Sequence, residues 1–258
     1  MEQTKRRVAI VTGATRRRGI GAAICRALAK DGIDIFFTCW RPFDRLMPWN
    51  VEEDEPQLLR SELLQTGVRC EYEELDQSRP EVAVELLDLV EKRLGKASIL
   101  INNAAYSTHD GYDTLDAQSL DAHYAVNVRG AMLISVEFAR RYPGGPGGRI
   151  VNMTSGQSIR PMPNELAYAA SKGAIEAFTT SVAIDLAARG ITVNAIDPGP
   201  TDSGWMDSEQ GLKQALMVDS PWGRVGSPED AARVVAFLVS EAAAWVNGQV
   251  IHADGGRR

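Results

Sequence analysis

Tyr168 and Lys172 are the two side chains in this sequence best suited to acid–base chemistry. They stand at the ends of the run Tyr168-Ala-Ala-Ser-Lys172, which has a helical pattern, and residues four apart lie on one face of a helix. A neighbouring ammonium favours the phenolate, so it lowers a tyrosine pKa from its ordinary value of about 10. Such a tyrosine could donate and accept a proton near neutral pH.

A serine is expected beside this pair. Met153-Thr-Ser155 ends a β-rich run that precedes the Tyr168 helix. In a parallel sheet, the carboxyl end of a strand faces the ligand, so the Ser155 hydroxyl could hydrogen-bond a substrate oxygen on which negative charge develops. A tyrosine and a lysine at this spacing also occur on solvent-facing helices. The combination with Ser155 is what predicts an active site.

A glycine-rich run near the start predicts a site for a pyrophosphate. The run is Thr12-Gly-Ala-Thr-Arg-Arg-Arg-Gly-Ile-Gly21, and it lies between a β-rich segment and a helical one. Glycines let the backbone approach a phosphate closely, and a helix N-terminus offers unpaired N–H groups. We therefore expect a dinucleotide to bind at this turn.

The second predicted strand indicates which nicotinamide dinucleotide binds. An NAD site usually places an acid at the end of this strand, whereas NADP requires a cation for its additional phosphate. The end here reads Thr38-Cys-Trp-Arg41 without an acid, and Asp34 stands at the strand's beginning. Arg18 and Arg41 are the expected phosphate ligands. The alternative for the loop arginines 16–18 is that all three are solvated.

Alternating β-rich and helical segments predict how these residues are positioned. Strands are expected at Arg7–Thr12, Ile33–Cys39, Arg69–Leu75, Ser98–Ile101, Arg149–Met153, Thr192–Ile196 and Gln249–Ala253. Helices are expected at Ile20–Lys30, Pro56–Gln65, Glu81–Leu94, Asp116–Arg141, Tyr168–Arg189 and Pro228–Ser240. This alternation predicts an α/β fold: a Rossmann-type, doubly wound, seven-stranded parallel sheet in three layers, as a single domain over residues 1–258.

Two longer stretches, Trp40–Glu55 and Pro198–Ser227, lack a regular pattern. The first ends in the acidic run Glu52–Glu55, which we interpret as a solvated loop. The second follows a strand's carboxyl end, so we expect a substrate lid at about residues 198–227, with an ordinary packed loop as the alternative. Its aromatic and methionine residues favour an apolar pocket; they are Trp205, Met206, Met217 and Trp222.

Composition excludes several functional classes. With 28 basic and 34 acidic residues, the chain has no overall basic field for nucleic acid or anionic lipid. No apolar stretch approaches the roughly 18 residues of a membrane span, and Met1–Arg7 does not begin a signal peptide, so we expect a cytoplasmic protein. Cys25, Cys39 and Cys70 are expected as reduced thiols, and the three histidines lack the spacing of metal ligands. No metal is expected.

Together the motifs resemble those of the short-chain dehydrogenase/reductase family, most nearly its 3-oxoacyl-(acyl-carrier-protein) reductase-like members. The resemblance covers essentially the whole chain. The shared motifs are Gly13, Gly19 and Gly21, Leu75-Asp76, Asn102-Asn-Ala-Ala105, Val126-Asn127, Ser155, Tyr168, Lys172, Asp197-Pro-Gly-Pro-Thr201 and Asp254-Gly-Gly256.

This resemblance implies an NADP(H)-dependent oxidoreductase that moves a hydride between nicotinamide and a carbonyl or secondary alcohol carbon. Tyr168 would exchange the proton, Lys172 would lower the pKa of Tyr168 and hold the nicotinamide ribose, and Asn127 would anchor a water of a proton relay. Relatives usually form homotetramers through the helix near Tyr168 and the final helix and strand. Cofactor contacts are implied at Gly13, Thr15, Arg18, Gly19, Ile20, Gly21, Trp40, Arg41, Asp76, Asn103, Ala104, Tyr168, Lys172, Pro198, Gly199 and Thr201.

The sequence departs from the family pattern in three places. The gap between the first two glycines of the loop, Gly13 and Gly19, holds five residues where three are usual. Ala105 replaces a usual glycine, and the segment Trp40–Glu55 is long enough to cover the adenosine end of a cofactor. None of these departures falls on Ser155, Tyr168 or Lys172.

Two other functions are consistent with parts of the pattern. An NADP(H)-sensing regulatory protein could keep this fold, although such proteins usually lose the tyrosine or lysine. An extended sugar-nucleotide epimerase or dehydratase also uses such a pair, but it carries a C-terminal substrate domain. Only Asp254–Arg258 follow the last predicted strand, so we expect no such domain.

Overall fold

The protein forms a seven-stranded, all-parallel sheet with the strand order β3-β2-β1-β4-β5-β6-β7. The structure is a computed structural model, and it describes residues 6–47, 49, 52–207 and 210–257. The strands are β1 (Val8–Val11), β2 (Asp34–Cys39), β3 (Cys70–Glu74), β4 (Ile99–Asn102), β5 (Gly148–Met153), β6 (Ile191–Asp197) and β7 (Val250–His252). The chain reverses its direction of progress between β3 and β4, because β4 pairs with β1 on the other side of the sheet centre. The predicted Rossmann-type topology is confirmed.

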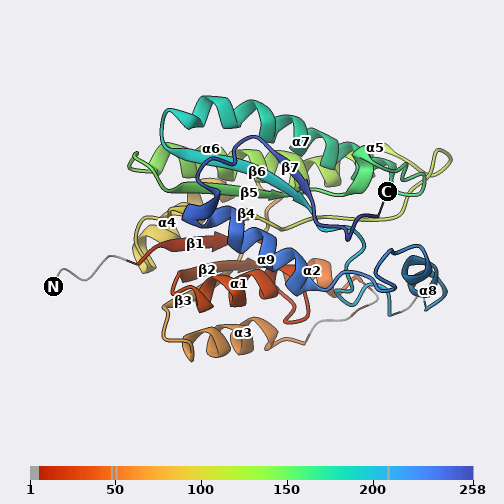
Figure 1. The fold of residues 1–258 in the computed structure, drawn as a ribbon, viewed down its shortest axis with the longest axis horizontal. Helices are drawn as coiled ribbons and strands as arrows, with labels where there is room; N and C mark the ends of the chain where they lie inside the picture. Colours follow the sequence, from red (N-terminus) through yellow and green to blue (C-terminus); the bar gives the residue numbers. More distant parts are fainter. Residues whose placement is uncertain (1–5, 48, 50–51, 208–209, 258) are drawn as a thin grey trace.

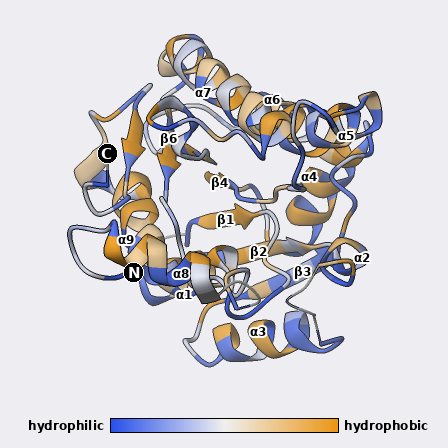
Figure 2. Ribbon diagram, turned by 90° about the vertical axis from the view of Figure 1, so that its right-hand side faces the viewer, coloured by the Kyte–Doolittle hydropathy of each residue, from blue (hydrophilic) through white to orange (hydrophobic). Residues whose placement is uncertain are grey.

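Helices cover both faces of the sheet and make three layers (Figure 1). One face carries α1 (Ile20–Lys30), α3 (Glu55–Leu64) and α9 (Pro228–Val239), and the other carries α4 (Val82–Arg93), α6 (Ala131–Arg141) and α7 (Leu166–Ala187). Figure 2 shows the largely hydrophobic strands between these two helical layers.

Alternation along the strands explains how one sheet supports two cores. In β1, Ala9 and Val11 belong to the core under α1 and α9, whereas Val8 and Ile10 belong to the core under α4 and α6. Successive side chains of a strand point to opposite faces, so a strand covered on both sides must be apolar throughout. All four residues of β1 are buried.

The helix between β4 and β5 contains a π-helical turn. Residues 116–141 were expected to be helical, and they form α5 (Ala117–His123), the π-helix η1 (Tyr124–Gly130) and α6 (Ala131–Arg141) without a break. A π-turn adds a residue to the helical repeat and is frequent at functional sites. Asn127 stands in the middle of this turn and is buried.

Both stretches that were expected to be irregular contain a helix, so that part of the prediction is wrong. Within 40–55 the chain forms α2 (Arg41–Asp44), whose second residue, Pro42, has a backbone angle suited to a helix start. Within 198–227 it forms α8 (Gln210–Val218), where Leu212 and Leu216 are one helical turn apart. The other predicted strands and helices lie within two residues of their observed bounds.

Several smaller predictions can be compared with the described residues. Cys25, Cys39 and Cys70 are buried and unpaired, as expected. Asp34 is fully buried at the start of β2, where it accepts hydrogen bonds from the backbone and the guanidinium of Arg69. Asp34 therefore stabilises the start of β2 against the segment before β3, and it does not lie at the strand's ligand-binding end.

No helix in the described ranges is long and apolar enough to cross a membrane. Residues 1–5, 48, 50–51 and 208–209, which belong to the predicted N-terminal and irregular segments, lie outside the described chain.

Candidate active site

Ser155, Tyr168 and Lys172 meet at the carboxyl edge of the sheet. Ser155 follows the end of β5 in extended backbone, and Tyr168 and Lys172 lie one turn apart on α7. The Lys172 side chain is buried, and its Nζ donates a hydrogen bond to the Met153 carbonyl at 2.9 Å. That Nζ lies 5.4 Å from the centre of the Tyr168 ring. The predicted trio is brought together by two regular elements.

Burial controls the electrostatics of the Tyr168 phenol. It raises the pKa of Tyr168 above its ordinary value, the nearby charge of Glu165 raises this pKa further, and a hydrogen-bonding interaction with Ser155 lowers it. The prediction of a lowered pKa is therefore wrong for this structure. The physical reason is that burial is the largest influence on this phenol, while the Lys172 ammonium lies over the ring and is itself desolvated.

Burial also changes the proton affinity of Lys172. With a relative exposure of 3%, the ammonium loses most of its hydration, and its pKa falls to about 8. An ammonium has three donors. The Met153 carbonyl is the one acceptor that the described residues offer to it, so two donors remain for a ligand.

The buried Asn127 side chain connects two segments that border the site. Its side-chain Oδ1 accepts the Tyr106 N–H at 2.7 Å, and its Nδ2 donates to the Tyr106 carbonyl at 2.8 Å and to Ser171 Oγ at 2.9 Å. Ser171 in turn donates to the Tyr168 carbonyl. The π-turn thus ties the segment after β4 to the α7 turn that carries Tyr168.

Close packing explains the glycines of the predicted phosphate loop. Gly13 has a φ of 72°, and a Cβ there would come within 2.5 Å of the Ala104 backbone. A Cβ at Gly21 would come within 2.7 Å of the Asn103 side chain, which donates to the carbonyls of Thr12 and Gly13. The loop and the segment after β4 are therefore one rigid unit.

The N-terminus of α1 has the properties of an anion site. Gly19 is its N-cap and Ile20 its first residue; no side chain caps this end, and no acidic residue lies in the first turn. The first N–H groups of a helix lack intrahelical acceptors and carry a partial positive charge. This end of α1 faces the same edge of the sheet as Tyr168.

The end of β2 lies against the phosphate loop, but the cation there already has partners. Thr15 Oγ1 accepts the Trp40 N–H at 3.2 Å. The Arg41 guanidinium is paired with Glu74 at the end of β3 and with Glu53 at 3.0 Å. A phosphate at this position would compete with both carboxylates for Arg41.

Arg18 points to the predicted lid and not to the end of β2. Its guanidinium pairs with Asp202 at 3.0 Å and with Asp207 at 2.5 Å, and Lys213 of α8 pairs with Asp202. The two additional loop residues thus extend the phosphate loop as far as the segment after β6. Arg18 and Arg41, the two expected phosphate ligands, thus each have carboxylate partners in this structure, and their role at a phosphate stays a prediction.

Arg16 is a residue that the sequence reasoning did not single out. Its guanidinium pairs with Asp44 of α2 at 3.3 Å, donates to the Ser203 carbonyl at 2.7 Å and lies 4.4 Å from the centre of the Trp49 ring. It joins the loop, the segment after β2 and the lid. Because Arg16, Arg17 and Arg18 are consecutive and identical, the sequence did not indicate which of them contacts these other segments.

The segment after β6 begins with a tight turn. Gly199 has a φ of 60°, and its N–H donates to the Asp197 carboxylate, which also faces His252. Thr201 is buried and donates to the carbonyl of Pro198.

Two further groups of predicted residues can be placed. Of the predicted apolar residues, Met206 is buried whereas Trp222 is largely exposed. Asp76 and Ala104 were also predicted to contact the cofactor. The Asp76 carboxylate accepts the Ser78 N–H. The Ala104 N–H donates to the Thr12 hydroxyl.

Two acidic residues near the N-terminus of α7 were also missed: Asp110 from the segment after β4, and Glu165. The Asp110 carboxylate accepts the N–H groups of Leu166 and Ala167. Glu165 stands at the N-cap position and makes no capping hydrogen bond. The spacing Glu165-x-x-Tyr168 was visible in the sequence, but nothing in it indicated that a second residue would cap the helix.

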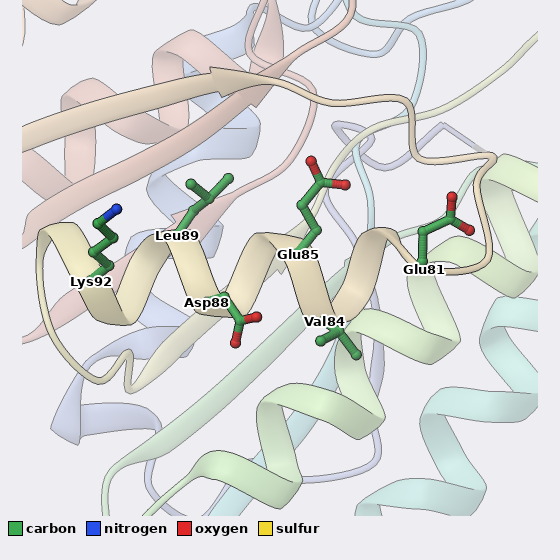
Figure 3. Close-up of a pocket in the computed structure, with 6 residues that line it drawn as sticks. All are labelled: Glu81, Val84, Glu85, Asp88, Leu89 and Lys92. Atoms are coloured by element: carbon green, nitrogen blue, oxygen red, sulfur yellow. The ribbon is translucent and has the colours of Figure 1, made fainter.

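A surface pocket elsewhere does not share these residues. It is lined by one face of α4, with Glu81, Val84, Glu85, Asp88, Leu89 and Lys92 (Figure 3). Five of the six lie on α4 and Glu81 is its N-cap, and none of them is Ser155, Tyr168 or Lys172. Those three residues lie at the sheet edge and not in this pocket.

Comparisons with known proteins are consistent with this arrangement. A family model described as enoyl-(acyl carrier protein) reductase matches residues 13–258. The chain is 49% identical to the oxidoreductase YjdA of Bacillus subtilis, over 99% of this chain and 98% of that protein. It is 35% identical to an NADPH-dependent aldehyde reductase-like protein of Arabidopsis thaliana, over 97% and 93% of the two chains. A short chain dehydrogenase of Burkholderia cenocepacia, solved in complex with NADP, superposes with a TM-score of 0.86 at 33% identity, over 98% of both chains.

Proposed function

Because the chain belongs to the short-chain dehydrogenase/reductase family, an oxidoreductase family whose members use nicotinamide cofactors, we propose that it transfers a hydride between NADP(H) and a carbonyl or secondary alcohol carbon. A 3-oxoacyl-(acyl-carrier-protein) reductase-like activity is the specific form of this proposal. The chain would work as one cofactor-binding domain with a lid at about residues 198–227.

The observation that carries the proposal is the convergence of Ser155, Tyr168 and Lys172. Tyr168 holds its proton at neutral pH, as a phenol of ordinary pKa also does, and can donate it to a substrate oxygen during reduction. Because burial raises the pKa of Tyr168, this donation depends on groups that stabilise the phenolate. The Ser155 hydroxyl stabilises the negative charge on that oxygen. The Lys172 charge favours the phenolate that remains after the proton has left.

The residues around the trio fit a dinucleotide. The uncapped N-terminus of α1 offers N–H groups to a pyrophosphate, and the two free donors of Lys172 suit the hydroxyls of a ribose. Gly13, Thr15, Asn103, Ala104, Pro198 and Thr201 are the surrounding residues assigned to cofactor contact. The nicotinamide supplies or accepts the hydride. Asn127 keeps the role proposed from the family pattern, as the anchor of a water in a proton relay to Lys172.

A preference for NADP(H) is supported by charge at the end of β2. No acid takes the position after β2 that would hold an unmodified ribose, and Arg41 stands there. Arg18 on the adjoining loop is the second proposed phosphate ligand, where a phosphate would compete with Asp202 and Asp207. The name of the Arabidopsis relative includes NADPH, and the Burkholderia structure contains NADP.

Homotetramer formation is also part of the proposal. Ile184 on α7 has a relative exposure of 77%, and Trp245, which follows α9, is fully exposed. Ile184 lies on the helix, and Trp245 between the final helix and strand, to which the family resemblance assigns the subunit contacts. Light scattering of the purified protein at micromolar concentration should give four times the 28.1 kDa chain mass; a monomer mass would contradict this part.

The decisive experiment is to measure NADPH and NADH consumption with a panel of β-ketoacyl thioesters, enoyl thioesters, diketones, quinones and cyclic ketones. We expect turnover of ketones with NADPH preferred. Turnover of enoyl thioesters alone would replace carbonyl reduction by double-bond reduction. NADPH binding without turnover of any compound would favour a regulatory sensor instead.

A further inference from the structure

Glu176 lies on α7 in line with the proposed proton donor and its lysine. It follows Lys172 by four residues and Tyr168 by eight, and all three belong to one continuous helix, Leu166–Ala187. Residues spaced by four are neighbours on a helix surface. The Glu176 carboxylate therefore lies one turn beyond the Lys172 side chain on that surface.

The Glu176 carboxylate accepts hydrogen bonds from both sides of Ser155. Its Oε1 accepts the Thr154 hydroxyl at 3.0 Å and the Gln157 side-chain amide at 2.7 Å, and the Ser158 hydroxyl lies 3.4 Å from the same oxygen. Thr154 directly precedes Ser155, and Gln157 and Ser158 belong to the short 3-10 turn that directly follows it. Three donors from the segment that carries Ser155 thus converge on one oxygen atom of α7.

Docking of α7 on the sheet is provided by other contacts. Lys172 Nζ donates to the Met153 carbonyl. The buried Asn152 side chain donates to Thr179 Oγ1 at 2.9 Å. These contacts join α7 to β5 itself, whereas the three donors that reach Glu176 all lie beyond the end of the strand. Glu176 therefore fixes the turn after β5, in addition to the packing of helix on strand.

The position of this turn has a direct consequence for the chemistry of Ser155. A hydroxyl that stabilises a developing negative charge must lie within about 2.7–3.1 Å of the oxygen that carries it. A displacement of about 1 Å in such a group can cost about 10²-fold in rate. Hydrogen bonds to a carboxylate are about twice as strong as neutral ones, so Glu176 is a firm anchor for the turn.

We propose that Glu176 is a positioning residue that holds the Ser155 turn, so that the Ser155 hydroxyl stays within hydrogen-bonding distance of the substrate oxygen that meets Tyr168. In this role Glu176 acts through Ser155 and needs no contact with substrate or cofactor. The inference rests on the proposed function, because it assumes that Ser155 stabilises the substrate oxygen.

Kinetics of single and double variants test whether Glu176 acts through Ser155. With the ketone that the parent protein reduces fastest, Glu176→Ala should lower kcat at least about tenfold and leave the KM for NADPH within about twofold. In a Ser155→Ala background the same substitution should change kcat by less than about twofold, because the hydroxyl that Glu176 positions is already absent. Glu229→Ala removes an exposed carboxylate from the first turn of α9 and should leave kcat unchanged.

Glu176→Gln is the conservative variant. All three donors end on Oε1, and a glutamine keeps a carbonyl oxygen that can accept from them. The kcat of Glu176→Gln should therefore stay within about threefold of the parent value. A loss as large as that of Glu176→Ala would show that the negative charge one turn from Lys172 matters and not the position of Ser155, and it would overturn the inference.

Ketone binding separates this inference from the proposed function. Saturation-transfer NMR with NADP⁺ and ethyl 3-oxobutanoate follows a complex in which the ketone is not reduced. We expect Ser155→Ala and Glu176→Ala to weaken ketone binding by similar factors and the double variant to weaken it no further.

This binding pattern without turnover of any ketone would uphold the inference and overturn the proposed function. Ketone turnover with equal kcat in the parent protein and Glu176→Ala, or with losses that add in the double variant, would overturn the inference alone. Absence of both the binding pattern and turnover would overturn both.

Discussion

The two ends of the candidate site are built in different ways. The proton-transfer end, with Ser155, Tyr168 and Lys172, is held by β5 and α7 and by hydrogen bonds to backbone carbonyls. The arginine end, with Arg16, Arg18 and Arg41, is held by ion pairs between loops and short helices. The ion pairs of Arg18 lie at the surface, where such pairs are weak and depend on salt, whereas the Arg16–Asp44 pair is largely buried. Buried hydrogen bonds to the backbone are not easily exchanged. The proposed chemistry is thus at the fixed end, and the proposed cofactor selection and lid contact are at the adjustable end.

The largest expected effect comes from removing the phenol at the fixed end. Tyr168→Phe should lower kcat for ketone reduction by about 10²- to 10⁴-fold, because it removes the group that protonates the substrate oxygen. NADPH binding, followed by cofactor fluorescence, should change little. Near-normal turnover by Tyr168→Phe would show that another group protonates the substrate, and it would contradict the assignment of proton transfer to this end of the site.

A pH profile examines the same end through Lys172. Its pKa of about 8 is lowered by burial, so the ammonium is complete below that pH and is lost above it. Because the ammonium stabilises the phenolate, kcat/KM for ketone reduction should be level below about pH 8 and fall about tenfold per pH unit above it. Rates measured in buffers of constant ionic strength check this, and a profile that rises through this range would exclude the assigned role.

Sequence reasoning succeeded at the fixed end because the pattern of a strand or helix determines which residues reach the sheet edge. Met153-Thr-Ser155 and Tyr168-x-x-x-Lys172 are short-range patterns of this kind. The partners of Arg18 are 184 and 189 residues away, in a segment where α8 was not predicted. Periodicity does not reveal which loop folds against which. The raised pKa of Tyr168 was missed for a related reason, because burial depends on everything that packs around the ring.

Substitution at the end of β2 should produce a moderate and selective effect. Arg41→Ala should raise the KM for NADPH by about tenfold and leave the KM for NADH within about twofold, because only NADPH carries the additional phosphate. Arg140→Ala on the exposed side of α6 is the matched control. Equal losses with both cofactors would show that Arg41 merely supports the loop.

Glu74→Gln should change the KM for NADPH in the direction opposite to Arg41→Ala. It removes the carboxylate that competes for Arg41, so the KM for NADPH should fall by about two- to fivefold. Initial rates with varied NADPH measure the change. A higher KM would mean that Glu74 orients Arg41 for the phosphate instead of competing with it.

The smallest effect is expected at the contact between loop and lid. Arg18 and Asp207 are 54% and 53% exposed, and such pairs contribute about 0.2–1 kcal/mol. Asp207→Asn should therefore change the substrate KM by less than about fivefold, and the change should disappear at high salt. A large effect that persists in salt would show that the lid is fixed as firmly as the proton-transfer end.

The π-turn at Tyr124–Gly130 also has a consequence for how the molecule tolerates insertions and deletions. Each residue of an α-helix turns the chain by roughly 100° about the helix axis, so the additional residue in this turn rotates α5 against α6. Deleting one residue within 124–130 would restore a continuous α-helix but turn either Asn127 away from Tyr106 or the buried face of α6 away from the sheet. The segment is therefore intolerant of a change in length.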